Sequence, residues 1–334
     1  MKADVHRSFV DPSRVTDRRH WQRLHGRIAL ISMAVALFAH DALGAAGLVE
    51  QLQLVLVPIA LLGILHGGAD PWVGRRLMQD LHRPAPRATF YTLYLMAMAL
   101  VLILWWVLPL ATLGAFLLIS ILHFGDQDAT TFGLPTRPLD VVVLGTLPVL
   151  GPCLAHPGEV AVLFGWLTGA PSESLAPRIA WAMQPIACLW LIGIGMVISR
   201  VALERGARRA RRLALAVSVI ALVMVLLPPL VAFALYFCLL HSFGHLLDMA
   251  TARDGPWSRW SMSQWAWRLW PATLGALLMG GLGAWALEVL QPDAAPPGAD
   301  TVRVLFWGLA ALTVPHVMLH AAWHRTRTRR PTSA

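Results

Sequence analysis

Six histidines of this chain lie in four short motifs, and each motif falls inside or at the end of a strongly apolar stretch. The motifs are LHGGAD with His66, LHFGDQD with His123, LLHSFGHLLD with His241 and His245, and VPHVMLH with His316 and His320. Ionisable side chains at membrane depth are costly and usually mark a functional site, and imidazole is the commonest metal ligand. The motifs therefore predict a metal centre held inside a bundle of membrane helices.

The composition indicates which elements must position these histidines. Hydrophobic residues make up 57% of the chain and charged residues only 13%, against roughly 25% charged residues in an ordinary soluble domain. The mean hydropathy is +0.61. We therefore expect an all-α fold, a polytopic transmembrane helix bundle whose surroundings are the lipid bilayer.

The net charge of +9 does not indicate a nucleic-acid partner, because no basic helix or aromatic-basic stripe accompanies it. Lys and Arg residues concentrated in cytoplasmic loops explain the excess better. Three widely spaced cysteines fall in apolar segments and form no CxxC pair, so we expect them to be core residues.

Apolar runs bounded by charge, Pro or Gly predict about ten spans. They lie near residues 28–47, 49–67, 89–109, 112–126, 140–165, 178–200, 212–228, 229–250, 268–290 and 302–322. The fifth run contains Pro148, Pro152 and Pro157, and the seventh and eighth meet at Pro228 and Pro229. A helix is expected to break or tilt at these prolines.

The distribution of basic residues predicts the orientation. With ten spans and a cytoplasmic N-terminus, 25 of the 27 Lys and Arg residues fall on the cytoplasmic side, as the positive-inside rule requires. We expect both termini in the cytoplasm, with a basic tail at 1–27, a transmembrane catalytic domain at 28–322 and a second basic tail at 323–334. The first apolar run is expected to be a retained helix rather than a cleaved signal peptide.

This topology brings the six histidines to a similar depth. All lie on even-numbered spans, which would run from outside to inside, and all fall in the inner half or at the inner end. The spacing of four residues also places His241 and His245 on one helical face. For the histidines outside the four motifs we expect interfacial, packing or tail positions; they are His6, His20, His25, His40, His82, His156 and His324.

Carboxylates and glycines follow the histidines closely. A metal-bound imidazole usually donates its other N–H to a carboxylate, a carbonyl or water, and the nearby acids are Asp70, Asp126, Asp128 and Asp248. An equal alternative for Asp70 and Asp128 is that they cap or solvate helix ends. Gly67, Gly68, Gly125 and Gly244 remove bulk beside the histidines, which would permit close helix packing or access for a substrate.

Taken in order, these motifs resemble a known family. HGGAD at 66–70, HFGDQD at 123–128, HSFGH at 241–245 and PH at 315–316 resemble the Brp/Blh family of membrane β-carotene 15,15'-dioxygenases. The resemblance implies a helical membrane enzyme that splits β-carotene with O2 into two all-trans-retinal. It also implies a non-haem Fe(II) cofactor bound by His66, His123, His241 and His245. His316 and His320 could supply a ligand, a hydrogen-bond donor beside the metal, or packing.

The chemistry of the motifs agrees with the resemblance. Ferrous iron with open coordination positions is suited to oxygen activation, whereas four protein ligands would close a tetrahedral zinc site. A carotenoid is soluble in the bilayer and would enter between helices into a long apolar tunnel. Candidate lining residues are Trp72, Phe124, Phe237 and Phe243.

Two other classes of membrane protein also use histidines. A di-iron lipid hydroxylase or desaturase normally contains HxxHH boxes, and none occurs in this sequence. A haem-binding or ion-translocating bundle would need two opposed histidines rather than four convergent motifs. From the apolar spans we expect a multi-pass protein of the cell inner membrane. The family's product suggests a functional link to a retinal-binding rhodopsin.

Overall fold

The computed structural model describes residues 12–250, 261–290 and 296–328. These residues form helices joined by short loops, and no β-strand occurs among them. The helices are α1 (Pro12–Leu37), α2 (His40–Gly44), α3 (Leu48–Pro58), α4 (Asp70–Asp80), α5 (Pro86–Val107), α6 (Pro109–Thr131), α7 (Pro138–Ala155), α8 (Pro157–Thr168), α9 (Ser172–Arg205), α10 (Ala207–Leu226), α11 (Pro229–Leu235), α12 (Phe243–Ala250), α13 (Met262–Leu290) and α14 (Ala299–Thr328). The all-α prediction is confirmed.

Two of the membrane helices contain irregular turns. A π-helical segment, η1 (Ile59–Gly63), and a 3-10 segment, η2 (Ile64–Ala69), join α3 to α4. A second π-helical segment, η3 (Tyr236–Ser242), joins α11 to α12. Such turns are rare and often occur at functional sites, and both regions carry histidine motifs.

Eight helical segments of the described chain are long and apolar enough to cross a membrane. They are Leu48–Asp80, Pro86–Val107, Pro109–Thr131, Pro138–Ala155, Ser172–Arg205, Pro229–Ala250, Ser263–Leu287 and Ala299–Trp323. The other two of the ten expected spans correspond to α1 and α10. Both are helical, but arginines occupy the first turns of α10 and part of α1, so their apolar parts are too short.

The helix breaks expected at Pro157 and at Pro228–Pro229 are confirmed, whereas Pro148 and Pro152 lie inside α7 without interrupting it. Helix α7 ends at Ala155 and α8 begins at Pro157, so the 140–165 run is divided in two. Helix α10 ends at Leu226 and α11 begins at Pro229. Proline is well placed at a helix start, because the first backbone N–H groups have no partner within the helix.

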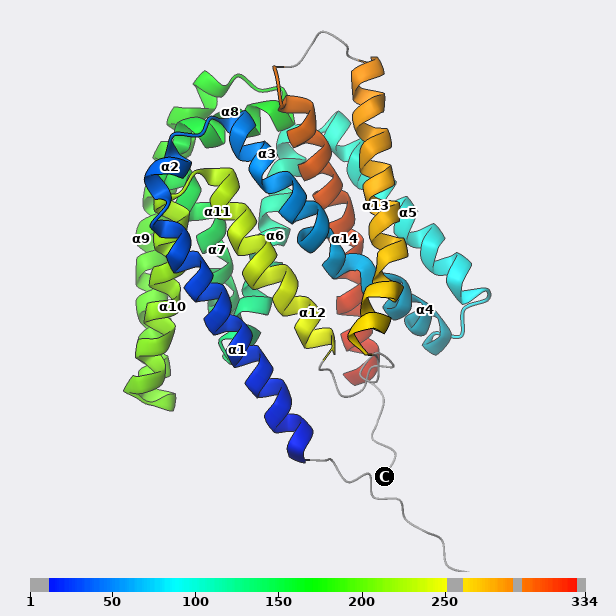
Figure 1. Ribbon diagram of the computed structural model, residues 1–334, viewed down its shortest axis with the longest axis horizontal. Helices are drawn as coiled ribbons and strands as arrows, with labels where there is room; N and C mark the ends of the chain where they lie inside the picture. The colour runs from blue at the N-terminus through cyan, green and yellow to red at the C-terminus, as the bar shows by residue number, and fades with distance from the viewer. Residues whose placement is uncertain (1–11, 251–260, 291–295, 329–334) are drawn as a thin grey trace, which may run out of the picture.

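The bundle surrounds α14, which packs against α4, α5, α8 and α13, while α7, α9 and α10 form a neighbouring group. In Figure 1, α1 begins and α14 ends at the same, lower end of the bundle. This arrangement agrees with two termini on one side. Residues 12–27 and 323–328, expected in the basic tails, belong to α1 and α14.

Large apolar side chains cover the outside of the bundle. Leu93, Met96 and Leu100 on α5 and Leu189 and Leu191 on α9 are about half exposed or more. A contiguous apolar exterior is unstable in water and stable against lipid tails. The fold is therefore that of a membrane protein.

Candidate metal centre

Helix α14 contributes two histidines to the centre of the bundle. His316 and His320 are four residues apart, so they lie on one helical face, and their ring centroids are 4.4 Å apart. His316 is 2% exposed. Helix α14 thus presents two imidazoles on one face, directly after Pro315.

The segment η3–α12 brings a second pair of histidines to the same place. The ring of His245 lies 5.0 Å from that of His316 and 5.0 Å from that of His320. One ligand nitrogen from each of these three residues lies within 4.8 Å of the others. His241, in the π-helical turn, is completely buried.

Helix α6 adds His123 between the two pairs. Its ring centroid lies 4.7 Å from that of His241, 5.3 Å from that of His316 and 6.3 Å from that of His245. The structure therefore brings together five of the six motif histidines from three membrane segments. We call His123, His241, His245, His316 and His320 the histidine cluster.

The sixth histidine, His66, belongs to the 3-10 segment η2, and its side chain lies outside the described residues. Its neighbour Gly68 packs closely on α13, because a Cβ there would lie 3.2 Å from Leu269 and 3.3 Å from Thr273 Oγ1. The proposed ligand role of His66 stays a prediction.

Asp70, at the start of α4, contacts two members of the cluster. His316 donates from Nδ1 to both carboxylate oxygens at 2.8 and 2.9 Å, and His320 Nε2 lies 3.5 Å from Oδ1. The Tyr94 hydroxyl donates to Oδ2 at 2.8 Å. Asp70 is 1% exposed, so this buried charge depends on these three partners.

The other three acids have different surroundings. Asp128 is buried and accepts a hydrogen bond from Tyr236 at 2.8 Å. Asp248 accepts from the side-chain amides of Gln127 and Gln22. Asp126 is exposed on α6. We predicted that these acids contact metal-binding histidines. Asp70 shows such a contact most clearly, because it lies against His316 and His320, the pair on α14.

Aromatic rings surround His241. Phe237 stacks on it at 5.8 Å with an interplanar angle of 14°, and Phe124 meets it edge-on at 4.6 Å. Phe237 fits because Gly63 has no side chain: a Cβ there would lie 2.5 Å from the Phe237 ring. The π turn is therefore packed against η1.

Glycines allow two segments that carry cluster histidines, α6 and α12, to pack closely against their neighbours α7 and α1. A Cβ on Gly125 of α6 would lie 1.8 Å from the Val141 carbonyl of α7, and one on Gly145 would lie 1.8 Å from the Ile121 carbonyl. Only glycine permits such backbone contact. Gly244 has the same role towards α1, because its Cβ would lie 3.1 Å from His25.

Sequence reasoning missed two residues that support the site, Tyr94 and His25. The signal for Tyr94 was a hydroxyl-bearing ring in an apolar span, where a buried hydroxyl needs a partner. His25 donates from Nε2 to the Leu239 carbonyl of η3 at 2.7 Å and is 7% exposed. We expected His25 to be an interfacial side chain or a satisfied core group, and it is the second; its contact with the π turn, however, had no sequence signal.

The histidine cluster fits a metal ion. Metal–nitrogen bonds to histidine are about 2.0–2.1 Å, so nitrogens on opposite sides of an ion lie about 4 Å apart. The ligand nitrogens of His245, His316 and His320 lie within 4.8 Å of one another. Binding one ion between them would therefore need only small side-chain movements. The donor set is all imidazole, with Asp70 hydrogen-bonded beyond it.

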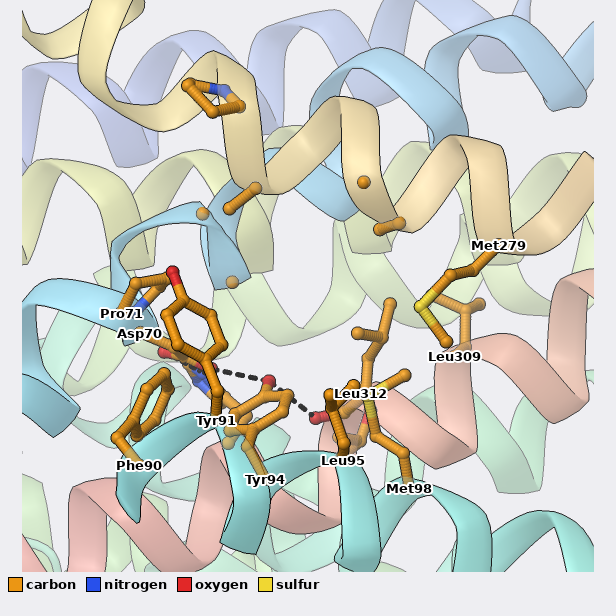
Figure 2. A pocket seen from close by; sticks show the side chains of 18 of the residues that line it. Asp70, Pro71, Phe90, Tyr91, Tyr94, Leu95, Met98, Met279, Leu309 and Leu312 are labelled. Carbon is orange, nitrogen blue, oxygen red and sulfur yellow. Dashed lines mark hydrogen bonds and ion pairs between the residues drawn. The ribbon is translucent and has the colours of Figure 1, made fainter. Parts of the chain in front are cut away.

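A cavity of about 280 Å³ adjoins the cluster at His316 and Asp70. Figure 2 shows it between the side chains of α5 and those of α13 and α14. Trp72, Phe124, Phe237 and Phe243, which we expected along a tunnel, are not among the residues that line this cavity. Phe243 is 48% exposed and lies against His25.

Known proteins resemble this chain over most of its length. Residues 57–324 match the family model described as "Beta-carotene 15,15'-dioxygenase". The chain is 28% identical over 283 residues to the "Beta-carotene 15,15'-dioxygenase" of uncultured marine bacterium 66A03, covering 81% of this chain and 93% of that protein.

A second relative comes from an archaeon. The chain is 31% identical over 241 residues to the "Probable beta-carotene 15,15'-dioxygenase Blh" of Halobacterium salinarum, covering 64% of this chain and 67% of that protein. No solved structure gives a significant match. The region matched by the family model contains all six motif histidines and begins after α1.

Proposed function

This chain belongs to the beta-carotene 15,15'-dioxygenase family, and we propose that it cleaves β-carotene with O2 through a histidine-bound ferrous ion. Cleavage at the 15,15' double bond gives two molecules of all-trans-retinal. The observation that carries the proposal is the convergence of His245, His316 and His320 inside an apolar membrane bundle. Family membership favours this reading over a lipid desaturase or a haem-binding bundle.

Two ligand sets are consistent with the residues, and they share His245. The family resemblance gives His66, His123, His241 and His245, whereas the spacing of nitrogens favours His245 with the α14 pair. We propose that the ion lies in the histidine cluster, with His245 bound to it in either set.

Iron suits the proposed reaction better than zinc does, although imidazole binds both metals. Bound ferrous iron with open positions supplies oxygen activation, which zinc, having no redox chemistry, does not. Neutral imidazoles leave the positive charge of the ion uncompensated, and the Asp70 carboxylate, hydrogen-bonded to His316, supplies the nearest negative charge that we identify.

Asp70 also orients the α14 pair. When His316 donates its Nδ1 proton to the carboxylate, its Nε2 keeps a lone pair directed away from Asp70, so the tautomer is fixed. Tyr94 holds the other carboxylate oxygen. These contacts position a metal ligand without taking part in carbon–carbon cleavage.

The remaining task of the protein is to place the correct double bond and exclude water. The rings of Phe124 and Phe237 cover His241, and Trp105, Tyr236 and Leu240 are fully buried in the surrounding core. The cavity beside His316 is lined mainly by apolar side chains, and these would hold an apolar polyene through its shape. Regioselectivity then depends on how far each arm of the substrate extends from the cluster.

The setting of the reaction follows from the substrate. We propose that β-carotene reaches the site from the lipid bilayer, that the protein resides in the cell inner membrane, and that both termini face the cytoplasm. The retinal formed would serve a retinal-binding rhodopsin.

Expression in a bacterium that makes β-carotene tests the proposal. We expect loss of the orange colour and formation of retinal, and we expect neither with His123→Ala, because this substitution removes a member of the histidine cluster. His40→Ala is the matched control, since His40 is exposed and contacts Leu37 and Asp41. Unchanged β-carotene with the unmodified chain would contradict the proposed activity.

A further inference from the structure

The cavity beside the histidine cluster lies between the helices α5, α13 and α14 and the segment η1–η2 that precedes α4. Its lining residues include Met98 of α5, Gly275 and Met279 of α13, Leu309 and His316 of α14, and Asp70 of α4. We call it the α5–α13 recess.

One end of the recess is polar and belongs to the histidine cluster. Asp70, Tyr94 and His316 line it, and Tyr94 and His316 both donate hydrogen bonds to Asp70. Figure 2 shows Asp70 at one end of the recess, together with Tyr94, whose hydroxyl donates a hydrogen bond to it. A molecule lying in the recess therefore has one end beside the candidate metal ligands.

The other end is apolar. Met98, Leu309 and Met279 lie there, on the side away from Asp70 in Figure 2. Leu309 precedes His316 by seven residues on α14, which corresponds to about 10 Å along a helix. The recess thus extends about two helical turns from the cluster to a wall of thioether and aliphatic side chains.

The recess opens towards lipid. Tyr91, Leu95 and Met279 line it and are also 49%, 48% and 45% exposed. They lie on α5 and α13, two of the candidate membrane spans. A hydrophobic molecule dissolved in the bilayer can therefore enter between α5 and α13 without crossing water.

We propose that the α5–α13 recess holds one arm and terminal ring of the carotenoid, with Met98, Met279 and Leu309 forming the wall against the ring. The inference rests on the proposed function, because it assumes that a carotenoid is the substrate. Pockets for drug-sized ligands measure about 300–1,000 Å³. A recess of about 280 Å³ takes only part of so long a molecule, as cleavage at its centre requires.

The proposal also assigns a specificity. A hydroxyl group on the terminal ring would be buried against Met98, Met279 and Leu309, which offer no strong hydrogen-bond partner. Burying a hydroxyl without a partner is unfavourable. The recess therefore prefers an unsubstituted ring to a hydroxylated ring. The expected difference in kcat/KM is roughly 100-fold, as an apolar pocket achieves against an added hydroxyl.

Two glycines of α13 provide a matched test. A Cβ on Gly275 or on Gly283 would meet nothing within 4 Å, and both residues are partly buried, but only Gly275 lines the recess. Gly275→Leu should fill the recess and lower kcat/KM for β-carotene about tenfold or more, with metal content unchanged. Gly283→Leu should stay within about twofold of wild type.

Binding gives a second readout that does not depend on turnover. Against a His123→Ala background, Gly275→Leu should reduce the β-carotene that copurifies with the protein, and Gly283→Leu should not. Wild-type kcat/KM and wild-type carotenoid binding in Gly275→Leu would overturn the proposal. A wild-type chain that forms no retinal would instead reject the proposed function, so the two failures are distinguishable.

If Gly275→Leu fails to fold, which would also remove its metal, Met279→Gln provides the independent test. The amide would offer the ring hydroxyl a partner, and a regained hydrogen bond is worth about fivefold to tenfold. We expect the ratio of kcat/KM for a carotenoid hydroxylated on both rings to that for β-carotene to rise by this factor. An unchanged ratio would overturn the assignment of the far wall.

Discussion

Two pairs of histidines with the same spacing meet in the centre of this bundle, and they are held there in different ways. His316 and His320 lie on the regular helix α14 and contact a carboxylate, Asp70. His241 and His245 lie across the junction of a π turn and α12, and aromatic rings pack on His241. Both pairs reach the same point, because His245 is 5.0 Å from each member of the other pair.

The difference separates two ways of orienting an imidazole. A hydrogen bond to a carboxylate fixes both the direction of the ring and its tautomer. Stacking fixes the plane of the ring and leaves its proton unassigned. We therefore expect the α14 pair to depend on the charge of one residue and the η3–α12 pair to depend on packing.

The largest effect is expected at the residue where the two pairs meet. His245→Ala should abolish metal binding, because His245 belongs to both candidate ligand sets. The measurement is the iron content of protein purified in detergent, with His40→Ala as the control. Iron at the wild-type level in His245→Ala would remove this residue from the site.

Comparing His316→Ala with His66→Ala separates the two ligand sets. If the α14 pair binds the metal, His316→Ala should lose iron as completely as His245→Ala. If His66 is the ligand instead, its variant should lose iron while His316→Ala retains a weakened site. Iron at the wild-type level in both variants would contradict both ligand sets.

The carboxylate that holds the α14 pair should have the next largest effect. Asp70→Asn keeps the shape but removes the charge, and loss of such a partner typically weakens metal affinity by about 10–100-fold. Competition with a chelator measures this affinity. Asp41→Asn, at an exposed aspartate paired with His40, should be indistinguishable from wild type, and an unweakened Asp70→Asn would show that the carboxylate does not orient a ligand.

The packing that holds His241 should contribute less. Phe237→Leu removes a stacked ring whose pairing is worth about 1 kcal/mol, so we expect about fivefold weaker metal binding and a lower unfolding temperature. Phe38, 92% exposed, provides the control substitution Phe38→Leu. If Phe237→Leu lost as much metal affinity as Asp70→Asn, the stacked ring and the hydrogen bond would be equally important for orienting the histidines.

The smallest effect is expected at α1. His25→Leu removes the donor to the Leu239 carbonyl of the π turn, which should cost about 1 kcal/mol of unfolding free energy. His25→Gln keeps an N–H donor and should recover part of this loss. Equal destabilisation by the two substitutions would show that His25 acts through its volume and not through its hydrogen bond.

The same comparison shows what the sequence could predict. Apolar runs and prolines were enough to locate the helices and the breaks at Pro157 and Pro229, because chain composition decides what can lie in a bilayer. The depth of the motif histidines followed from the alternation of spans. A spacing of four residues predicted a shared helical face for His241 and His245, and the same rule describes His316 and His320 on α14.

The remaining features depend on contacts between distant segments. The sequence does not indicate that η3 contains a π turn, so the orientation of His241 relative to His245 could not be derived from their spacing. Asp70 was assigned to a histidine four residues away, yet its described partners, His316 and Tyr94, lie on α14 and α5. The lining of the recess likewise depends on how α13 packs, which no local pattern specifies.

The position of the α14 pair in the chain has a consequence for biosynthesis. His316 and His320 lie on the last of the membrane helices described, whereas Asp70 and Tyr94, which hold them, are synthesised far earlier. Until α14 has been inserted, Asp70 is a buried carboxylate without its histidine donor. A nascent chain therefore cannot assemble the complete centre, and loading of a metal ion would follow the synthesis and insertion of α14.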